Sequence, residues 1–369
     1  MRTKLHLFLA LAFVAGITHA AAQQPVITSF SQNGILACTN LQPGTVASVE
    51  WASSLAGPWQ TNWSGLDAVT VGPNGNIQVS VPMYYRVRGV AYTPTPSGMV
   101  LIPAGSFTMG DTLDGDANAL PTNVYVSAFY MDTNLVSWSQ WQGVYAYATN
   151  HGYGFVNAGA GKAANHPVQM VGWYDCVKWC NARSQQAGKA PVYYTDAGLT
   201  KVYTNGEVTV YVNWGAKGYR LPTEAEWEKA ARGGLSGQRF PWGNLISQTN
   251  ANYYGATGSY SYDLGPNGYN SIGLVGGSPY TSPVGSFAAN GYGLYDMAGN
   301  VWQWCWDWYG TPYAGGTDPR GVASGSDRVF RGGGWNGYAI YCRAAGRAYD
   351  YPTGRYYNLG FRSVLPPGQ

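Results

Sequence analysis

The chain begins with short alternating apolar and polar stretches and changes to helical spacing further on. Between residues 25 and 90, runs such as ILACTN (35–40) and IQVSV (77–81) are separated by Gly, Pro and Asn. Strands this short, with turn residues between them, are typical of a small β-sandwich. Segment 91–98 is rich in Pro and Thr, which favours a linker. We therefore expect an all-β sandwich over 25–90 and a second domain over 99–366.

Three segments of the second domain carry apolar residues at helical spacing. They are residues 137–152, residues 171–188 and a helix that begins after Thr223. In the third segment Thr223 can cap the helix, and Glu226 stands three residues on, which is the spacing of a capping box. Gly233 then ends the apolar stripe. We expect a helix in each segment.

Strand-like runs precede these helices, at residues 99–105, 106–110 and 123–132. After residue 234 the chain is rich in Gly, Tyr, Asn and Ser, which favours turns and irregular loops. Helices early in the domain and loops late in it predict an α+β fold with little regular structure.

The first residues have the three-part order of a secretory signal peptide. A basic start, MRTK, is followed by an apolar run over 5–17 and by small residues up to Ala22. The run is short for a membrane span, which needs about 20 residues. We therefore expect residues 1–22 to be removed from a secreted or periplasmic protein that has no membrane span after cleavage.

Composition narrows the class of partner. Charged residues are 11% of the chain, whereas Tyr alone accounts for 30 residues and Trp for 15. Loss of Arg2 and Lys4 with the signal peptide lowers the formal net charge from +3 to about +1. A nucleic-acid partner is not expected, because it needs clustered Lys and Arg.

Seven motifs of the second domain resemble those of one family. Within residues 99–365 they occur in the order MVLIPAGSFTMG, HPVQMVGWYDCVKWCN, YRLPTEAEWEKAARGG, FPWGN, NGYGLYDMAGNVWQW, RGGGW and NLGFR. Together they resemble the formylglycine-generating-enzyme, or sulfatase-modifying-factor, family. The resemblance implies a C-type-lectin-like fold and leaves the N-terminal β domain outside it. Since the family includes copper oxidases, iron-dependent sulfoxide synthases and non-catalytic binding proteins, function depends on the site.

The copper oxidases of this family bind Cu(I) between two cysteines in a pattern like G-G-S-[YW]-x-C-x4-C. Thiolates are soft ligands that suit Cu(I). Here Cys342 matches the second cysteine, Gly337 stands at the first, and Gly334 replaces the serine. Copper and formylglycine oxidase activity are therefore not expected, although Cys342 stays the candidate catalytic residue. The iron-dependent branch needs three histidines, and only His151 and His166 remain after signal cleavage.

The resemblance implies another role for Cys342. Family members similar to this chain carry WCWDWY together with CR-x3-R, as here around Cys305 and Cys342. We expect a Cys305–Cys342 disulfide, which would stabilise the late loops by roughly 2–4 kcal/mol on the chain-entropy model. Cys176 and Cys180 lie four residues apart on one helix face, a spacing more typical of packing than of a bridge.

The family's enzymes also hold Ca²⁺, and YDMAGNVWQW maps onto one of their sites. Oxygen donors from a tight loop suit this ion. Gln303 stands where Glu is usual, and Asp263 is our candidate acidic partner for a second half-site. The alternative is a Gly-Asn turn and packed tryptophans that need no metal. The expected ligands are the side chains of Asp296, Gln303 and Asn252 and the carbonyls of Gly299, Val301 and Tyr253.

Between the framework residues of the C-terminal segment lie mainly Tyr, Asn, Gly, Asp, Ala, Thr and Ile. All are reachable from an AAC codon through changes of adenine, which resembles the variable region of diversity-generating-retroelement target proteins. Tyr with Gly and Asn is also typical of paratopes. We therefore expect a surface that binds a protein, peptide or glycan; the alternatives are an undiversified Tyr-rich loop and an enzyme with unrecognised chemistry. The expected ligand contacts are Trp335, Asn336, Tyr338, Tyr341, Tyr349, Asp350, Tyr351, Arg355, Tyr356 and Tyr357.

Overall fold

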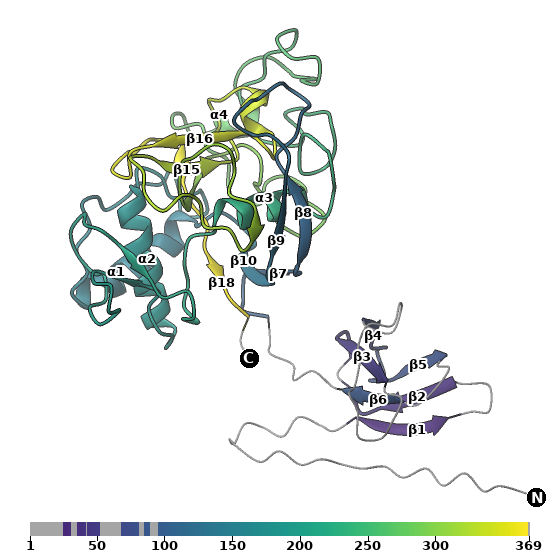
Figure 1. Cartoon of the computed structure of the whole chain (residues 1–369). Coiled ribbons are helices and arrows are strands. Elements are labelled where there is room, and N and C mark those ends of the chain that lie inside the picture. The colour runs from purple at the N-terminus through teal and green to yellow at the C-terminus, as the bar shows by residue number, and fades with distance from the viewer. Residues whose placement is uncertain are drawn as a thin grey trace, which may run out of the picture. The chain divides into compact units, whose positions relative to one another are not determined.

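The chain divides into two compact units between residues 94 and 95, inside the expected linker (Figure 1). The expected signal peptide and part of the 91–98 linker lie outside the described residues. The computed structural model of the chain describes residues 25–30, 35–41, 43–51, 68–80, 85–88 and 95–367.

The described residues of the first unit form two antiparallel sheets of three strands each. Alternation along β2 buries Leu36 and Cys38. These side chains share one apolar core with Ala47 and Val49 of β3 in the other sheet. In the described part of this unit, a core shared by two sheets confirms the expected β-sandwich. The sheets are β1 (Val26–Phe30), β2 (Ile35–Thr39) and β5 (Ile77–Ser80), and β4 (Val69–Thr70), β3 (Val46–Trp51) and β6 (Tyr85–Arg88).

The second unit combines helices with small sheets, and this confirms the predicted α+β fold. The expected helices form as α1 (Trp138–Asn150), α2 (Trp173–Gln186) and α3 (Glu224–Arg232), and a short α4 (Ser271–Leu274) lies in the late loops. Figure 1 shows α1 and α2 side by side. Their contact includes Trp141 stacked on Trp179, with ring centroids 5.9 Å apart.

The strands of this unit are mostly short, as its Gly-rich sequence predicts. The largest sheet has the order β16-β15-β13-β17, and it carries the segment that follows residue 331. Within the described residues, no helix is both long and apolar enough to span a membrane. The sheets are β16 (Arg347–Asp350), β15 (Arg328–Arg331), β13 (Trp302–Trp308) and β17 (Leu359–Gly360); β18 (Val364–Leu365), β10 (Phe129–Asp132) and β7 (Met99–Ile102); β14 (Gly316–Thr317), β9 (Thr122–Val126) and β8 (Gly105–Met109); and β11 (Tyr193–Tyr194) and β12 (Tyr211–Val212).

The run 123–132, expected as one strand, forms two. β9 ends at Val126 and pairs with β8, whereas β10 begins at Phe129 and pairs with β7. Ser127 lies at the break, where its N–H and hydroxyl donate to the two carboxylate oxygens of Asp318, at 2.6 and 2.8 Å. A partner 191 residues away therefore divides the strand.

Helix α3 has the ends that its sequence predicts. The Thr223 hydroxyl accepts from the Glu226 N–H at 3.2 Å, and the Glu226 carboxylate accepts from the Thr223 N–H at 2.8 Å. Gly233 ends the helix in the left-handed conformation, with φ of 57°. All nine helix residues are buried, so α3 forms the centre on which the C-terminal segment packs.

Candidate functional site

Buried arginines hold the C-terminal segment against carboxylates of α3. Arg347 on β16 donates to both oxygens of Glu224, at 2.7 and 2.8 Å. Arg331 on β15 pairs with Glu228, and neither side chain is exposed. Arg343 pairs with two aspartates of the loop that follows β8. Because each guanidinium is paired in the interior, the backbone of the segment is held in one position.

The structure exposes six tyrosines of this segment, all of them expected ligand contacts. Their exposed fractions lie between 44% and 63%, well above those of typical core aromatics. Asn336 is also exposed, and Asp350 and Arg355 are half-buried. The set, called here the exposed tyrosines, consists of Tyr338, Tyr341, Tyr349, Tyr351, Tyr356 and Tyr357.

Tyr338 packs with aromatic residues that sequence reasoning missed. Its ring lies edge-on to Tyr254, with centroids 5.6 Å apart, and Tyr254 in turn meets Tyr269 at 4.9 Å. The Tyr254 N–H donates to the Gly337 carbonyl at 2.9 Å, which ties the two loops together. These tyrosines lie more than 60 residues before Tyr338, so no local spacing indicates the contact.

Tyr349 and Tyr356 also have neighbours that orient them. Tyr349 stacks on Tyr309, with ring centroids 3.8 Å apart, and the Arg347 guanidinium lies over the Tyr309 ring at 4.7 Å. A hydrogen bond with Asp350 raises the pKa of Tyr356. The rings of Tyr338, Tyr349 and Tyr356 are therefore oriented by neighbours before any ligand binds.

Trp335 is a correction to the expected contact set. Its side chain is buried, at 8% exposed, and its indole N–H donates to the Tyr357 carbonyl at 3.1 Å. It packs against Tyr269 and Tyr280 beneath the surface. A buried indole orients the loop that carries Tyr357, and its ring is not accessible to a ligand.

The Cys342 thiol is enclosed. Its residue has no exposed area, and a Cβ added at Gly333 would stand 2.9 Å from its sulfur. Burial raises the pKa of this thiol, and the nearby Asp263 carboxylate raises it further. The Cys342 sulfur is covered and protonated, and Gly337 stands at the position of the first cysteine, so these two positions offer no pair of thiolates for Cu(I).

The expected Cys305–Cys342 disulfide is not formed. All five cysteines are free thiols, and these two belong to different apolar clusters. Cys305 packs against α3, where its thiol contacts the Gln303 carbonyl at 3.9 Å. Cys342 packs instead with Phe240 and Tyr253. The two motifs WCWDWY and CR-x3-R occur together in the sequence, but the fold does not bring the sulfurs of Cys305 and Cys342 together.

The expected calcium ligands fall into two groups, one around Asp296 and Gln303 and the other around Asn252. In the first, the Gln303 side-chain oxygen already accepts from Trp227 at 2.8 Å and from Arg362 at 2.7 Å. The Arg362 guanidinium also donates to the carbonyl of Asp296. One Asp296 oxygen accepts from Gly285 at 2.7 Å, and burial raises the pKa of this carboxyl. Gln303 is thus occupied by hydrogen bonds within the protein.

The second group contains a buried oxygen that lacks a partner. Asn252 Oδ1 accepts no hydrogen bond from the described part of the chain, although the Asn252 amide donates to the Tyr280 carbonyl at 2.8 Å. The candidate acidic partner, Asp263, accepts instead from the Tyr253 hydroxyl at 2.5 Å and from two backbone N–H groups. An unpaired amide oxygen fits a hard cation or a water, whereas Asp263 is committed elsewhere.

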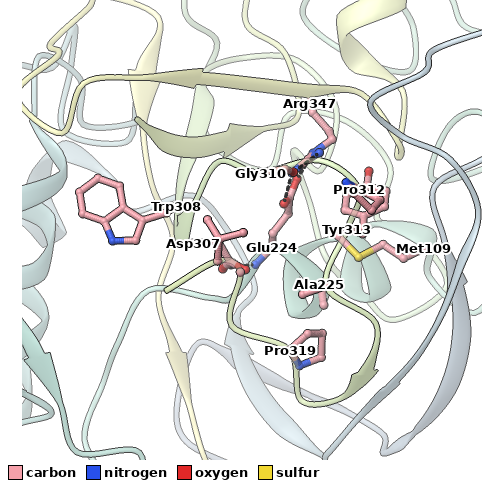
Figure 2. A pocket seen from close by; sticks show the side chains of 13 residues that line it. Met109, Glu224, Ala225, Asp307, Trp308, Gly310, Pro312, Tyr313, Pro319 and Arg347 are labelled. Carbon is pink, nitrogen blue, oxygen red and sulfur yellow. Dashed lines mark hydrogen bonds and ion pairs between the residues drawn. The ribbon is translucent and has the colours of Figure 1, made fainter. Parts of the chain in front are cut away.

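A hollow beside the N-terminus of α3 has acidic groups but little room. Figure 2 shows the Glu224–Arg347 pair on one side of it and Asp307 close by. Asp307 accepts from the Glu224 N–H at 2.7 Å and so adds a cap to α3. Burial and the Glu224 carboxylate raise the pKa of Asp307 to about 8. The cavity volume is about 20 Å³, which is near the size needed for one water molecule, so no substrate fits there.

Comparisons with known proteins agree with this architecture. The family model described as "Sulfatase-modifying factor enzyme 1-like domain" matches residues 88–366. The formylglycine-generating enzyme of Bos taurus is 34% identical, covering 72% of this chain and 74% of that protein. That of Thermomonospora curvata is also 34% identical, covering 73% and 94%. Among solved structures, Treponema denticola variable protein 1 matches with a TM-score of 0.57 at 31% identity, covering 73% of this chain and 95% of that one.

Proposed function

This chain belongs to the formylglycine-generating-enzyme, or sulfatase-modifying-factor, family, and we propose that it is an exported, ligand-binding member without copper oxidase activity. The observation that carries the proposal is the set of six exposed tyrosines on a frame of buried arginine pairs. Tyrosine contributes large contact area at low loss of rotamer entropy. The ligand class is a protein, a peptide or a glycan.

The chemistry around Cys342 supports the same proposal. A Cu(I) oxidase needs two accessible thiolates, and here one position is Gly337 while the other is a covered thiol whose pKa is raised by burial. The hollow shown in Figure 2 gives no substrate-sized alternative.

The alternative is an oxidase or another tailoring enzyme that acts on a protein or peptide. It is favoured by the 34% identity to formylglycine-generating enzymes. The two proposals differ in one assay. A sulfatase-type CxPxR peptide, incubated with the protein, Cu(I), oxygen and a thiol reductant, gains the aldehyde of formylglycine only if the oxidase proposal holds; copper without the protein is the control, because it oxidises the thiol only to a disulfide.

Binding is tested with peptide and glycan arrays probed by the wild-type chain and by a Tyr338→Ser/Tyr351→Ser/Tyr357→Ser variant. We expect a signal that the wild type gives and the variant loses. Equal signals from both proteins would place binding elsewhere, and turnover of the CxPxR peptide would replace the binding proposal by the enzymatic one.

The proposal keeps calcium at one of the two groups of expected ligands, the group that contains Asn252. The unpaired Asn252 Oδ1 is a suitable hard donor, whereas the Gln303 oxygen is already occupied. Metal analysis after dialysis, with Asn252→Ala as the matched variant, tests this directly. We expect about one Ca²⁺ per chain in the wild type and less in the variant; a metal-free wild type would remove calcium from the proposal.

A further inference from the structure

A groove of about 390 Å³ lies between α1 and α2, and none of its lining residues belongs to segment 336–358. Its volume lies within the range of small-molecule sites. One lining residue is charged, and its charge is positive. The lining residues are Ser139, Gln140, Gly143 and Val144 from α1, Arg183, Gln186 and Ala187 from the end of α2, and Tyr219.

The charged residue, Arg183, is held rigidly. Its Nη1 donates to both oxygens of Asp132, at 2.9 and 2.7 Å, and to the Ser363 hydroxyl at 2.7 Å. The guanidinium carbon lies 4.0 Å from the centre of the Tyr219 ring. Asp132 is itself satisfied, since it also accepts from the Ser363 N–H and hydroxyl. The guanidinium plane is therefore fixed before any ligand arrives.

The other edge of the same guanidinium is free to donate. Across the described ranges, Nε and Nη2 of Arg183 make no hydrogen bond, because Nη1 takes all of the bonds that this side chain forms. Neither nitrogen is among the buried atoms without a partner, so each keeps some exposed area, although the side chain as a whole is only 12% exposed. Two parallel N–H groups on a planar fork match the two oxygens of a carboxylate.

Gly143 is the second observation. It lies in the middle of α1, its φ is not in the left-handed region, and a Cβ added there would meet nothing within 4 Å. Glycine destabilises a helix interior relative to alanine, and neither backbone conformation nor packing requires it here. What its missing side chain does is leave the groove open.

We propose that this groove binds a carboxylate, with the Nε–Nη2 edge of Arg183 as the anchor. The amides of Gln140 and Gln186 are placed to hydrogen-bond the rest of the ligand, and Val144 and Tyr219 give it an apolar floor. The carboxylate comes from a free organic acid or from the C-terminus of a peptide, because both present the same planar pair of oxygens. No lining carboxylate opposes it.

The test is titration of three small probes into the intact protein. Calorimetry measures their affinity, and the ¹⁵N resonance of Arg183 Nε reports contact with this side chain. The probes are N-acetyl-Ala-Ala, its C-terminal amide and 3-phenylpropionate. Binding of both acids supports a general carboxylate site, and binding of the peptide acid alone identifies a peptide terminus. We expect the amide to bind at least tenfold more weakly, and acid binding to shift the Nε resonance.

Two variants separate the site from the fold. Gly143→Leu fills the groove, and we expect at least a tenfold loss of acid binding with a thermal midpoint that does not fall, because leucine favours a helix interior more than glycine. Gln142→Leu adds the same side chain at the neighbouring exposed position, which does not line the groove, and we expect less than a twofold change. Arg183→Lys keeps the charge but removes the fork, so binding should also fall at least tenfold. Equal affinity of acid and amide, undiminished acid binding by Gly143→Leu, or no binding of either acid at 10 mM would overturn the proposal.

Discussion

The layer around α3 and the exposed tyrosines use opposite chemistry within one domain. The three glutamates of α3 are buried, and each meets at least one arginine side chain. The exposed tyrosines are neutral and project from strands and loops that the same arginines anchor. In a chain with only 11% charged residues, several of the charges lie inside the domain, and the proposed contact surface is aromatic.

This difference separates what holds the segment from what can vary on it. Breaking a buried pair leaves an uncompensated charge in the interior, whereas an exposed ring makes few contacts on which the fold depends. Substitutions in the two regions should therefore affect different measurements, the first stability and the second binding.

Glu228→Gln should give the largest effect on stability. Glu228 pairs with both Arg232 and Arg331 and accepts from the Gly110 N–H at 2.7 Å, all in the interior. Loss of the charge leaves two buried guanidinium groups poorly compensated, so the free energy of unfolding should fall by about 3–5 kcal/mol. Urea unfolding followed by tryptophan fluorescence measures this; a fall below about 1 kcal/mol would contradict the buried-layer interpretation.

The pH dependence of stability tests the buried position of Asp307 beside α3. Its pKa is raised in the folded state to about 8, against about 4 in an unfolded chain. Between these values the folded state binds more protons, so this group lowers stability as pH rises, by at most about 1.4 kcal/mol per pH unit. Asp307→Asn cannot titrate. The wild type should therefore lose more stability than this variant between pH 5 and pH 8, and parallel pH profiles would show that Asp307 is ionised in the fold.

Trp335→Phe tests a residue that lies beneath the exposed tyrosines. The substitution keeps an apolar ring but removes the indole donor to the Tyr357 carbonyl. We expect a loss of about 1–3 kcal/mol, because a carbonyl that is left without its partner loses a hydrogen bond. Thermal unfolding measures it, and the exposed tyrosines Tyr356 and Tyr357 should become more susceptible to nitration. An unchanged midpoint would show that the Trp335 indole does not hold this loop in place.

Tyr351→Ser and Tyr357→Ser should give the smallest change in stability, within about 0.5 kcal/mol. Both rings are about 60% exposed, so little packing is lost. The same variants should weaken array binding by tenfold or more if these rings are central to the contact, since a few aromatic anchors dominate most interfaces. A large stability loss with unchanged binding would place these tyrosines in the frame.

Local sequence patterns were sufficient to predict those features that depend on interactions between residues close together in the chain. The ends of α3 follow from Thr223, Glu226 and Gly233, because a cap acts across three or four residues. Helical spacing located α1 and α2, since apolar periodicity reports the buried face directly. The ordered motifs indicated the family, and with it the fold and the missing first cysteine.

Contacts between distant segments were the part that sequence reasoning could not supply. Tyr254 contacts Tyr338 across 84 residues of sequence, and the bond from its N–H to the Gly337 carbonyl joins the two loops. The expected disulfide failed because Cys305 packs on α3 while Cys342 packs in another cluster. Trp335 was expected as a ligand contact because it stands in the C-terminal segment, yet its burial depends on Tyr269 and Tyr280, which pack against its ring.

The sequence by itself determined the ends of α3, the family and the glycine at position 337 where the copper oxidases of the family have a cysteine, because each depends on residues near one another in the chain or on a fixed motif. Tertiary structure alone decided which aromatic rings are exposed, which oxygens are already occupied and where Arg183 keeps a free edge. The physical reason is that burial and hydrogen bonding depend on which distant segments meet, and a linear pattern does not contain that distance.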